Sequence, residues 1–344
     1  METVLKNFYK NKKIFISGHS GFKGYWLTQS LIFFGAKVYC ISDKVYNKYN
    51  FLNLKKNKHF KQSYRDLNLV NIKKILREFK PDLIFHLAAQ SNLPLSYHSP
   101  YNTFKTNFNI SLKLLESLKN INSNITSLFI TSDKAYENMS LSRGYKEGDI
   151  LGGKDPYSAS KACTEIMINA YRESFNMRVA TARAGNVIGG NDFSKYRIVP
   201  DCVSALNKKK SIEIRNRYAT RPWQHVLDVI NGYLLLNMYL YKDKKISGSW
   251  NFGPNVDNNK TVEILAEKIV EYWGTGNIKF IKNKIKEDKL LQLNANKAYK
   301  YLKWKVKYKF DKSVNVTVDW YKNYYRNKNK TDLISISQIE EYFG

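Results

Sequence analysis

The sequence has few cysteines and no long hydrophobic run. Its three cysteines, Cys40, Cys163 and Cys202, are far apart and form no CxxC pair. We therefore expect free thiols, no disulfide framework and no bound metal. No run reaches the ~20 apolar residues of a membrane helix, and the first 30 residues lack the apolar stretch of a signal peptide. We expect a cytoplasmic protein with no membrane partner.

Acidic residues are scarce as well. The chain has 29 Asp and Glu against 57 Lys and Arg, a formal net charge of +28. Such a field attracts polyanions, so a basic nucleic-acid-binding protein that has kept a cofactor-like fold without turnover stays open as an alternative. However, the lysines are spread among asparagines, without zinc-finger spacing or a basic-zipper heptad. We favour a lysine-rich surface and expect no nucleic-acid partner.

Short apolar runs alternate with helix-length stretches through the first half of the chain. The expected strands include residues 14–16, 37–41, 83–87, 127–130 and 178–182, and the expected helices include 72–79, 111–118 and 157–175. This alternation is typical of βαβ units that form a parallel sheet. We therefore predict an α/β fold with a doubly wound parallel sheet of the Rossmann type and a smaller C-terminal substrate-binding lobe.

The alternation ends after Asn186, in loops rich in Gly, Asn, Arg and Pro. We place the NAD-binding Rossmann domain at 1–185, with a return segment near 224–252, and the substrate-binding lobe at 186–223 and 253–344. A helix over 314–325 is expected to lead into a charged linker and a short last helix. Ser337 and Glu340 in that last helix have capping-box spacing.

A glycine-rich turn follows the first expected strand. Gly18, Gly21 and Gly24 form a GxxGxxG pattern that opens a helix, with Phe22 inside it. Glycine lets the backbone turn tightly and approach a pyrophosphate, whose charge lies at the helix N-terminus. An ordinary glycine turn is the alternative, but the strand before it and the helix after it favour dinucleotide binding by these four residues.

The ends of the next strands carry further expected cofactor contacts. Asp43 ends the second strand, 19 residues after Gly24 (43 − 24). A carboxylate there can bind the adenosine ribose hydroxyls and repel a 2′-phosphate, which favours NAD over NADP. Lys44 weakens this choice, and a solvated loop residue is the alternative for Asp43. The other expected contacts follow the third and fourth strands: Asp66, Leu67, Leu87, Ala88 and Ala89. Helix packing is the alternative for the small residues.

Tyr157 and Lys161 form a YxxxK pair, which lies on one face of a helix. A phenol must lose its proton near neutral pH to act as the base in hydride transfer, and a nearby ammonium stabilises the phenolate. Lys161 could also hold the nicotinamide ribose. In a chain with 25 tyrosines the pair can arise by chance on a solvated face. Its place after a glycine turn favours the catalytic interpretation.

A second candidate group follows the strand expected at 127–130. Ser132, Asp133 and Lys134 offer a hydrogen-bond donor, a general acid and a general base in succession. Their position is the carboxyl edge of the sheet, where ligands bind. Hydride transfer alone would need the hydroxyl, so the additional acid and base indicate elimination.

The chain resembles the extended short-chain dehydrogenases/reductases and, within them, the CDP-glucose 4,6-dehydratases. The segments that carry the resemblance are GHSGFKGYWL (18–27), TSDKAY (131–136), GGKDPYSASK (152–161), RAGNVIGG (183–190) and ATRPWQHVLD (219–228). Related dTDP-glucose dehydratases show Thr-Asp-Glu at the catalytic turn. Lys134 stands where they have the glutamate, and in this the chain resembles the CDP-sugar branch of the family. The resemblance implies NAD as cofactor, a nucleotide-sugar substrate, most simply a CDP-hexose, and a homodimer joined through the helices around 111–118 and 157–175.

The resemblance also implies a reaction cycle and its residues. Tyr157 would take the proton of the sugar 4-hydroxyl while hydride passes from C4 to NAD, and Ser132 would fix that hydroxyl. Lys134 would remove the C5 proton or stabilise an enolate, and Asp133 would protonate the departing 6-hydroxyl before hydride returns to C6. The expected substrate contacts are Gln90, Asn186 and Arg221, the last two on the diphosphate.

One loop differs from the resemblance. Residues 91–97 read SNLPLSY, without the arginine that CDP-glucose enzymes usually carry shortly before the Ser-Tyr pair. This loop borders the sugar pocket in the family, so the hexose and even the base stay open. A nucleotide-sugar epimerase or reductase is the nearest alternative, because it would use Tyr157 and Ser132 and leave Asp133 and Lys134 idle.

Overall fold

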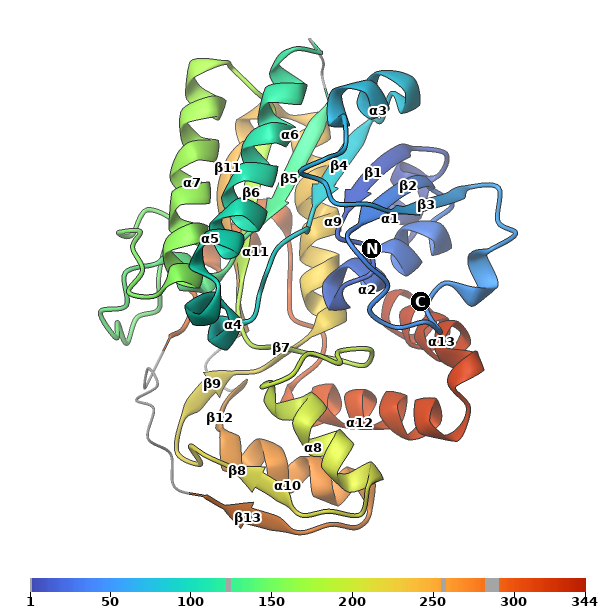
Figure 1. The fold of residues 1–344 in the computed structure, drawn as a ribbon, viewed down its shortest axis with the longest axis vertical. Helices are drawn as coiled ribbons and strands as arrows, with labels where there is room; N and C mark the ends of the chain where they lie inside the picture. The colour runs from blue at the N-terminus through green and yellow to red at the C-terminus, as the bar shows by residue number, and fades with distance from the viewer. Residues whose placement is uncertain (1, 122–124, 255–257, 282–290) are drawn as a thin grey trace.

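The computed structural model describes residues 2–121, 125–254, 258–281 and 291–344. Its centre is a seven-stranded parallel sheet with the order β11-β6-β5-β4-β1-β2-β3 (Figure 1). The strands are β1 (Lys13–Ser17), β2 (Lys37–Ser42), β3 (Phe60–Tyr64), β4 (Leu83–His86), β5 (Thr126–Ile130), β6 (Val179–Ala184) and β11 (Gly248–Phe252). The strand order reverses between β1 and β4, so the predicted doubly wound Rossmann sheet is confirmed.

Helices cover both faces of this sheet because successive side chains of a strand point to opposite sides. Ile14 and Ile16 of β1 face one apolar core, and Phe15 between them faces the other. The first core is closed by α1 (Glu2–Tyr9), α2 (Phe22–Phe33) and α9 (Val226–Lys242), and the second by α3 (Ile72–Phe79), α6 (Ile110–Lys119) and α7 (Pro156–Ser174). The central strands β4 and β5 are buried throughout, which explains the apolar runs at residues 83–85 and 128–130.

A second group of elements lies beyond the carboxyl ends of the strands (Figure 1). The helices there are α4 (Leu93–His98), α5 (Pro100–Phe104), α8 (Ile198–Asn207), α10 (Val262–Trp273) and α12 (Phe310–Arg326). Three two-stranded pairs accompany them: β7 (Val187–Ile188) with β10 (Gln224–His225), β9 (Thr220–Pro222) with β12 (Asn259–Thr261), and β8 (Ile212–Ile214) with β13 (Ile278–Phe280). Two further helices are α11 (Asn296–Leu302) and α13 (Thr331–Phe343).

The last helix differs from its expected start. Ser337 and Glu340 lie inside α13, which begins at Thr331, so they do not form its N-terminal cap. Buried Asp332 anchors this end of the helix to the sheet half: it accepts hydrogen bonds from Tyr25 Oη (3.0 Å) and Gln29 Nε2 (2.8 Å) of α2. The division into 1–185 with 224–252, and 186–223 with 253–344, stays a prediction. Within the described residues, no helix has the length and apolar character needed to cross a membrane.

Candidate active site

The glycine turn joins β1 to α2 at the point where the strand order reverses. Gly18 has φ +80°, and a Cβ atom on it would lie 2.5 Å from the backbone nitrogen of Ala88. A Cβ on Gly24 would overlap the carbonyl oxygen of Gly18. Packing inside the chain therefore requires these two glycines. Gly21 is different, because a Cβ there would make only ordinary contact with the Gly18 oxygen, at 3.6 Å.

The first turn of α2 can receive an anion. Gly21 is its N-cap and makes no side-chain hydrogen bond, and the first turn holds no acidic residue. The N–H groups of that turn are therefore not capped by the N-cap side chain. Phe22 is the first residue of the helix and is partly buried. This end of α2 suits a dinucleotide pyrophosphate.

The expected contacts after β2 and β3 lie in different surroundings. Asp43 directly follows β2 and is exposed; its Oδ2 accepts a 3.5 Å hydrogen bond from Tyr46. Asp66 is also exposed and accepts a 2.9 Å hydrogen bond from the backbone of Asn68. Leu67 is buried in the core between the sheet and α3 and α6, so a ligand could meet its backbone but not its side chain.

Residues 87–90 continue β4 past the end of the sheet. The Leu87 N–H donates to the carbonyl of Ser17 at 2.9 Å, which places this segment beside the glycine turn. Ala88 and Ala89 are partly buried. Gln90 is fixed from the other side, because its Nε2 donates to Thr103 Oγ1 of α5 at 3.1 Å.

Tyr157 and Lys161 lie in the first two turns of α7. Asp155 caps this helix by accepting a 2.9 Å hydrogen bond from the Ser158 N–H. Burial raises the pKa of Tyr157, and a hydrogen bond with Ser132 lowers it. Burial lowers the pKa of Lys161 to about 8. Each shift favours the neutral form of its group, because burial penalises the charged form.

Ser132 and Asp133 are buried at the carboxyl end of β5. The hydroxyl of Ser132 donates to Asp133 Oδ1 at 2.8 Å, and the Lys134 N–H donates to the same carboxylate oxygen at 3.0 Å. The charge of Asp133 also raises the pKa of Tyr157. The structure thus brings Ser132, Asp133 and Tyr157 together. Lys134 is partly buried in the same turn.

The expected diphosphate contacts lie toward the smaller lobe. Asn186 has φ +51°, and its carbonyl accepts a 3.3 Å hydrogen bond from the Gln224 N–H. Arg221 is in β9, where its Nη1 donates to the Thr220 carbonyl at 2.9 Å. The role of Arg221 on the diphosphate stays a prediction.

Further charged and aromatic residues face this site and were not predicted. Lys23 of α2 donates to Tyr233 Oη of α9 at 3.5 Å. Burial, together with the nearby charges of Arg197 and Lys161, lowers the pKa of Lys23 to about 7. Arg197 in turn donates to Ser91 Oγ at 3.2 Å, so an arginine does reach the loop 91–97. Lys23 could have been predicted from the sequence, because it lies inside the glycine turn. Tyr233 could not, because it lies in an apolar helix without a recognisable motif.

The structure combines a parallel sheet, a glycine turn where the strand order reverses, and a Tyr-Lys helix packed beside a Ser-Asp turn. This combination defines the extended short-chain dehydrogenase/reductase class. The comparisons agree with this geometry. The chain belongs to the GDP-mannose 4,6 dehydratase family, whose model matches residues 15–317. The expected family and fold are confirmed.

Three relatives illustrate the similarity. The chain is 35% identical to CDP-glucose 4,6-dehydratase of Salmonella typhimurium, over 98% of each chain. Among solved structures it is similar to UDP-N-acetylglucosamine 4-epimerase from Methanobrevibacter ruminantium, in complex with UDP-N-acetylmuramic acid (TM-score 0.81, 25% identity, 91% of this chain and 99% of that one). It also shares its fold with dTDP-glucose 4,6-dehydratase from Bacillus anthracis in complex with NAD (TM-score 0.80, 20% identity, 94% and 99%).

Proposed function

We propose that the protein is an NAD-dependent nucleotide-sugar 4,6-dehydratase, a lyase that converts CDP-glucose to CDP-4-keto-6-deoxyglucose. One observation carries the proposal: the buried carboxylate of Asp133 lies beside Ser132 and Tyr157. Hydride transfer needs the hydroxyl and the phenol, whereas elimination also needs an acid and a base. The name and the full-length similarity of the Salmonella relative support the lyase and the CDP-sugar.

The glycine turn fits NAD. The uncapped first turn of α2 would hold the pyrophosphate, and Gly21 would let it approach closely. Asp43 would bind the adenosine ribose, with Asp66, Leu67 and the segment 87–89 around the rest of the cofactor. Bound NAD would accept the hydride of sugar C4 and return it to C6.

The chain's own residues would move the protons. Tyr157 takes the proton of the 4-hydroxyl, which Ser132 positions, and the ammonium of Lys161 stabilises the phenolate. Asp133 protonates the departing 6-hydroxyl. Lys134 removes the C5 proton or, if it stays charged, stabilises the enolate that forms.

The substrate would lie between the sheet edge and the smaller lobe. Asn186 and Arg221 would bind the diphosphate, since an arginine can hold two phosphate oxygens at once. Gln90 would face the sugar. Arg197 would supply the positive charge that the loop 91–97 itself lacks, because it already contacts Ser91.

Location and assembly complete the proposal. A cytoplasmic homodimer would form through α6 and α7. Ile166 of α7 (58% exposed) and Phe175, which directly follows α7 (48% exposed), are apolar side chains suited to burial against a second copy. Sedimentation equilibrium of the wild-type protein, compared with Ile166→Glu, measures this directly.

Incubation with sugar nucleotides tests the proposed activity. CDP-glucose with NAD should give a 4-keto-6-deoxy sugar, detected by its absorbance in alkali and by mass spectrometry. Parallel reactions with dTDP-, UDP- and GDP-glucose test the base. A product that keeps its C6 oxygen would contradict the proposal and favour the epimerase or reductase alternative. Tight binding of nucleic acid without turnover would favour a non-catalytic nucleic-acid-binding protein.

A further inference from the structure

Glu165 continues the catalytic face of α7. Tyr157, Lys161 and Glu165 follow one another at intervals of four residues, so they lie along one side of the helix. The side chain of Glu165 is only 1% exposed. A carboxylate is therefore buried one turn beyond Lys161, on its side away from Tyr157.

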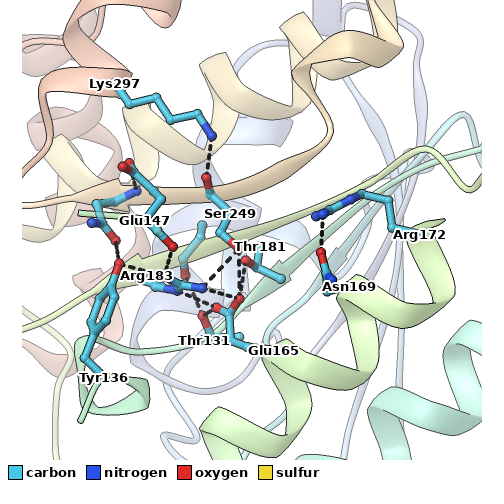
Figure 2. A network of polar contacts seen from close by, with 12 residues as sticks. Thr131, Tyr136, Glu147, Glu165, Asn169, Arg172, Thr181, Arg183, Ser249 and Lys297 are labelled. Carbon is cyan, nitrogen blue, oxygen red and sulfur yellow. Dashed lines mark hydrogen bonds and ion pairs between the residues drawn. The ribbon is translucent and has the colours of Figure 1, made fainter. Parts of the chain in front are cut away.

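This carboxylate is held by an arginine and by hydroxyl groups (Figure 2). Arg183 of β6 donates from Nε to Glu165 Oε1 and from Nη2 to Oε2, each at 2.9 Å. Thr181 of β6 and Ser249 of β11 donate to Oε2 at 2.7 and 3.1 Å. Burial alone would raise the pKa of Glu165, but Arg183 and these donors hold it below its usual range. Glu165 is ionised at neutral pH.

The same pair of charges clamps both ends of the catalytic turn (Figure 2). Thr131 Oγ1, at the start of the turn, donates to Glu165 Oε1 at 2.5 Å. At its end, Arg183 Nη1 donates to Tyr136 Oη at 2.6 Å. Residues 132–134 lie between these two attachments. The position of the turn relative to α7 therefore depends on Glu165 and Arg183.

Glu165 also acts on the charge of Lys161. Burial lowers the pKa of Lys161 to about 8, and the Glu165 carboxylate opposes that decrease. The other ionisable groups that face Lys161 are Tyr157 on its own helix, Lys23 from α2 and His86 at the end of β4. His86 is neutral because burial lowers its pKa to about 3, and Lys23, whose pKa is lowered to about 7, is either neutral or positively charged. Neither supplies negative charge to Lys161.

We infer that Glu165 is a positioning residue for catalysis: it keeps Lys161 protonated beside Tyr157 and fixes the catalytic turn through Thr131. The inference rests on the proposed function for the roles of Tyr157 and Lys161. It does not depend on elimination, since the same pair would serve an epimerase or a reductase. The carboxylate of Glu165 is enclosed by protein side chains, so it acts through Lys161 and Thr131.

The first test is the pH profile of Glu165→Gln. Glutamine keeps the size and an acceptor oxygen but removes the charge, so Lys161 should lose its proton at lower pH. The alkaline limb of kcat/KM should move down by about one pH unit, in the range for an opposite charge nearby. Glu173→Gln, an exposed position on the same helix (69% exposed), is the matched control and should leave the profile unchanged.

Two further variants separate this effect from a loss of folding. Glu165→Gln leaves Arg183 buried without its anion, which destabilises the protein. The double variant Glu165→Gln/Arg183→Gln removes both charges; it should regain stability and still show the shifted limb. Glu165→Asp keeps the charge and should keep the limb near its wild-type pH, with kcat reduced by the shorter reach to Thr131.

A direct titration makes the test independent of substrate. The ¹³Cε resonance of Lys161, assigned by its absence in Lys161→Arg, should titrate at lower pH in Glu165→Gln than in the wild type. An unchanged Lys161 titration in a folded single or double variant would overturn the inference. Failure of the wild type to convert CDP-glucose would instead overturn the proposed function and leave the titration to decide the role of Glu165.

Discussion

Gly185 packs directly against the carboxylate of Asp133: a Cβ atom on Gly185 would overlap Asp133 Oδ2. The contact arises because Gly185 follows β6 and Asp133 follows β5, and these strands are parallel neighbours. Any side chain at position 185 would therefore collide with the carboxylate of Asp133, the proposed acid.

Gly185→Ala should displace the Asp133 carboxylate while the sheet stays folded. We expect kcat to fall by about 10²-fold, the lower range for a lost acid–base group, with NAD affinity within about twofold of the wild type. Steady-state rates and cofactor titration measure both. Gly148→Ala is the control, because no atom lies within 4 Å of a Cβ there. Wild-type turnover in Gly185→Ala would show that Asp133 need not occupy its observed position.

Asp43 should make the protein bind NAD more tightly than NADP. Its exposed carboxylate would accept ribose hydroxyl hydrogen bonds and repel a 2′-phosphate. Calorimetry should give a preference of about tenfold or more, and Asp43→Asn should reduce it, since hydrogen bonds to a charged group contribute roughly 1.5–3 kcal/mol. Asp319→Asn, an exposed position on α12, serves as control. Tighter binding of NADP by the wild type would remove this role from Asp43.

Buried histidines should make the fold sensitive to mild acid. Burial lowers the pKa of His19 to about 4 and of His86 and His225 to about 3. Their unfolded value is about 6.5, so below that pH the unfolded chain binds more protons and the free energy of unfolding falls. Each histidine contributes a slope of about 1.4 kcal/mol per pH unit between pH 6 and 4.5. Burial raises the pKa of Asp228 to about 6, which opposes one of the three slopes.

Denaturant titrations at several pH values measure this slope. His86→Gln should make the slope shallower by about 1.4 kcal/mol per pH unit, the contribution of one histidine. His98→Gln, at an exposed position, is the matched control. Equal slopes for the wild type and His86→Gln would mean that His86 already binds a proton in the folded state.

Asp133 and Lys134 should be needed after the first hydride transfer, unlike Tyr157. Asp133→Asn keeps the shape but cannot protonate the leaving hydroxyl, and Lys134→Met cannot take the C5 proton. Single-turnover absorbance should therefore show reduced NAD accumulating in both variants. In Tyr157→Phe no reduced NAD should form, and turnover should fall at least about 10²-fold with cofactor affinity nearly intact. Wild-type turnover in both Asp133→Asn and Lys134→Met would contradict elimination.

The sheet and the catalytic groups could be predicted because each depends on residues close in sequence. The apolar run of β5 and the YxxxK spacing of Tyr157 and Lys161 are local patterns. The start of α13 was missed because Asp332, which anchors it, finds its partners in α2. Capping-box spacing at Ser337 had no such tertiary support.

The residues around the site were harder to predict for the same reason. Glu165 gains its partners from the turn after β5 and from β6 and β11, which only the folded sheet brings together. Lys23 and Tyr233 meet across 210 residues of chain. Long-range contacts of this kind leave no periodic pattern in the sequence, because a contact between two distant residues does not determine the types of the residues next to them in the chain.

Transfer of the sugar's own hydrogen tests the central claim most directly. CDP-glucose that carries deuterium at C4 is mixed with an equal amount of uniformly ¹³C-labelled, undeuterated CDP-glucose and converted to completion with NAD. If the protein is a 4,6-dehydratase, deuterium will appear at C6 of the ¹²C product alone, that product will lack the C6 oxygen, and a reaction in deuterated water will label C5. Retention of the C6 oxygen, or deuterium shared between the ¹²C and ¹³C products, would contradict the account.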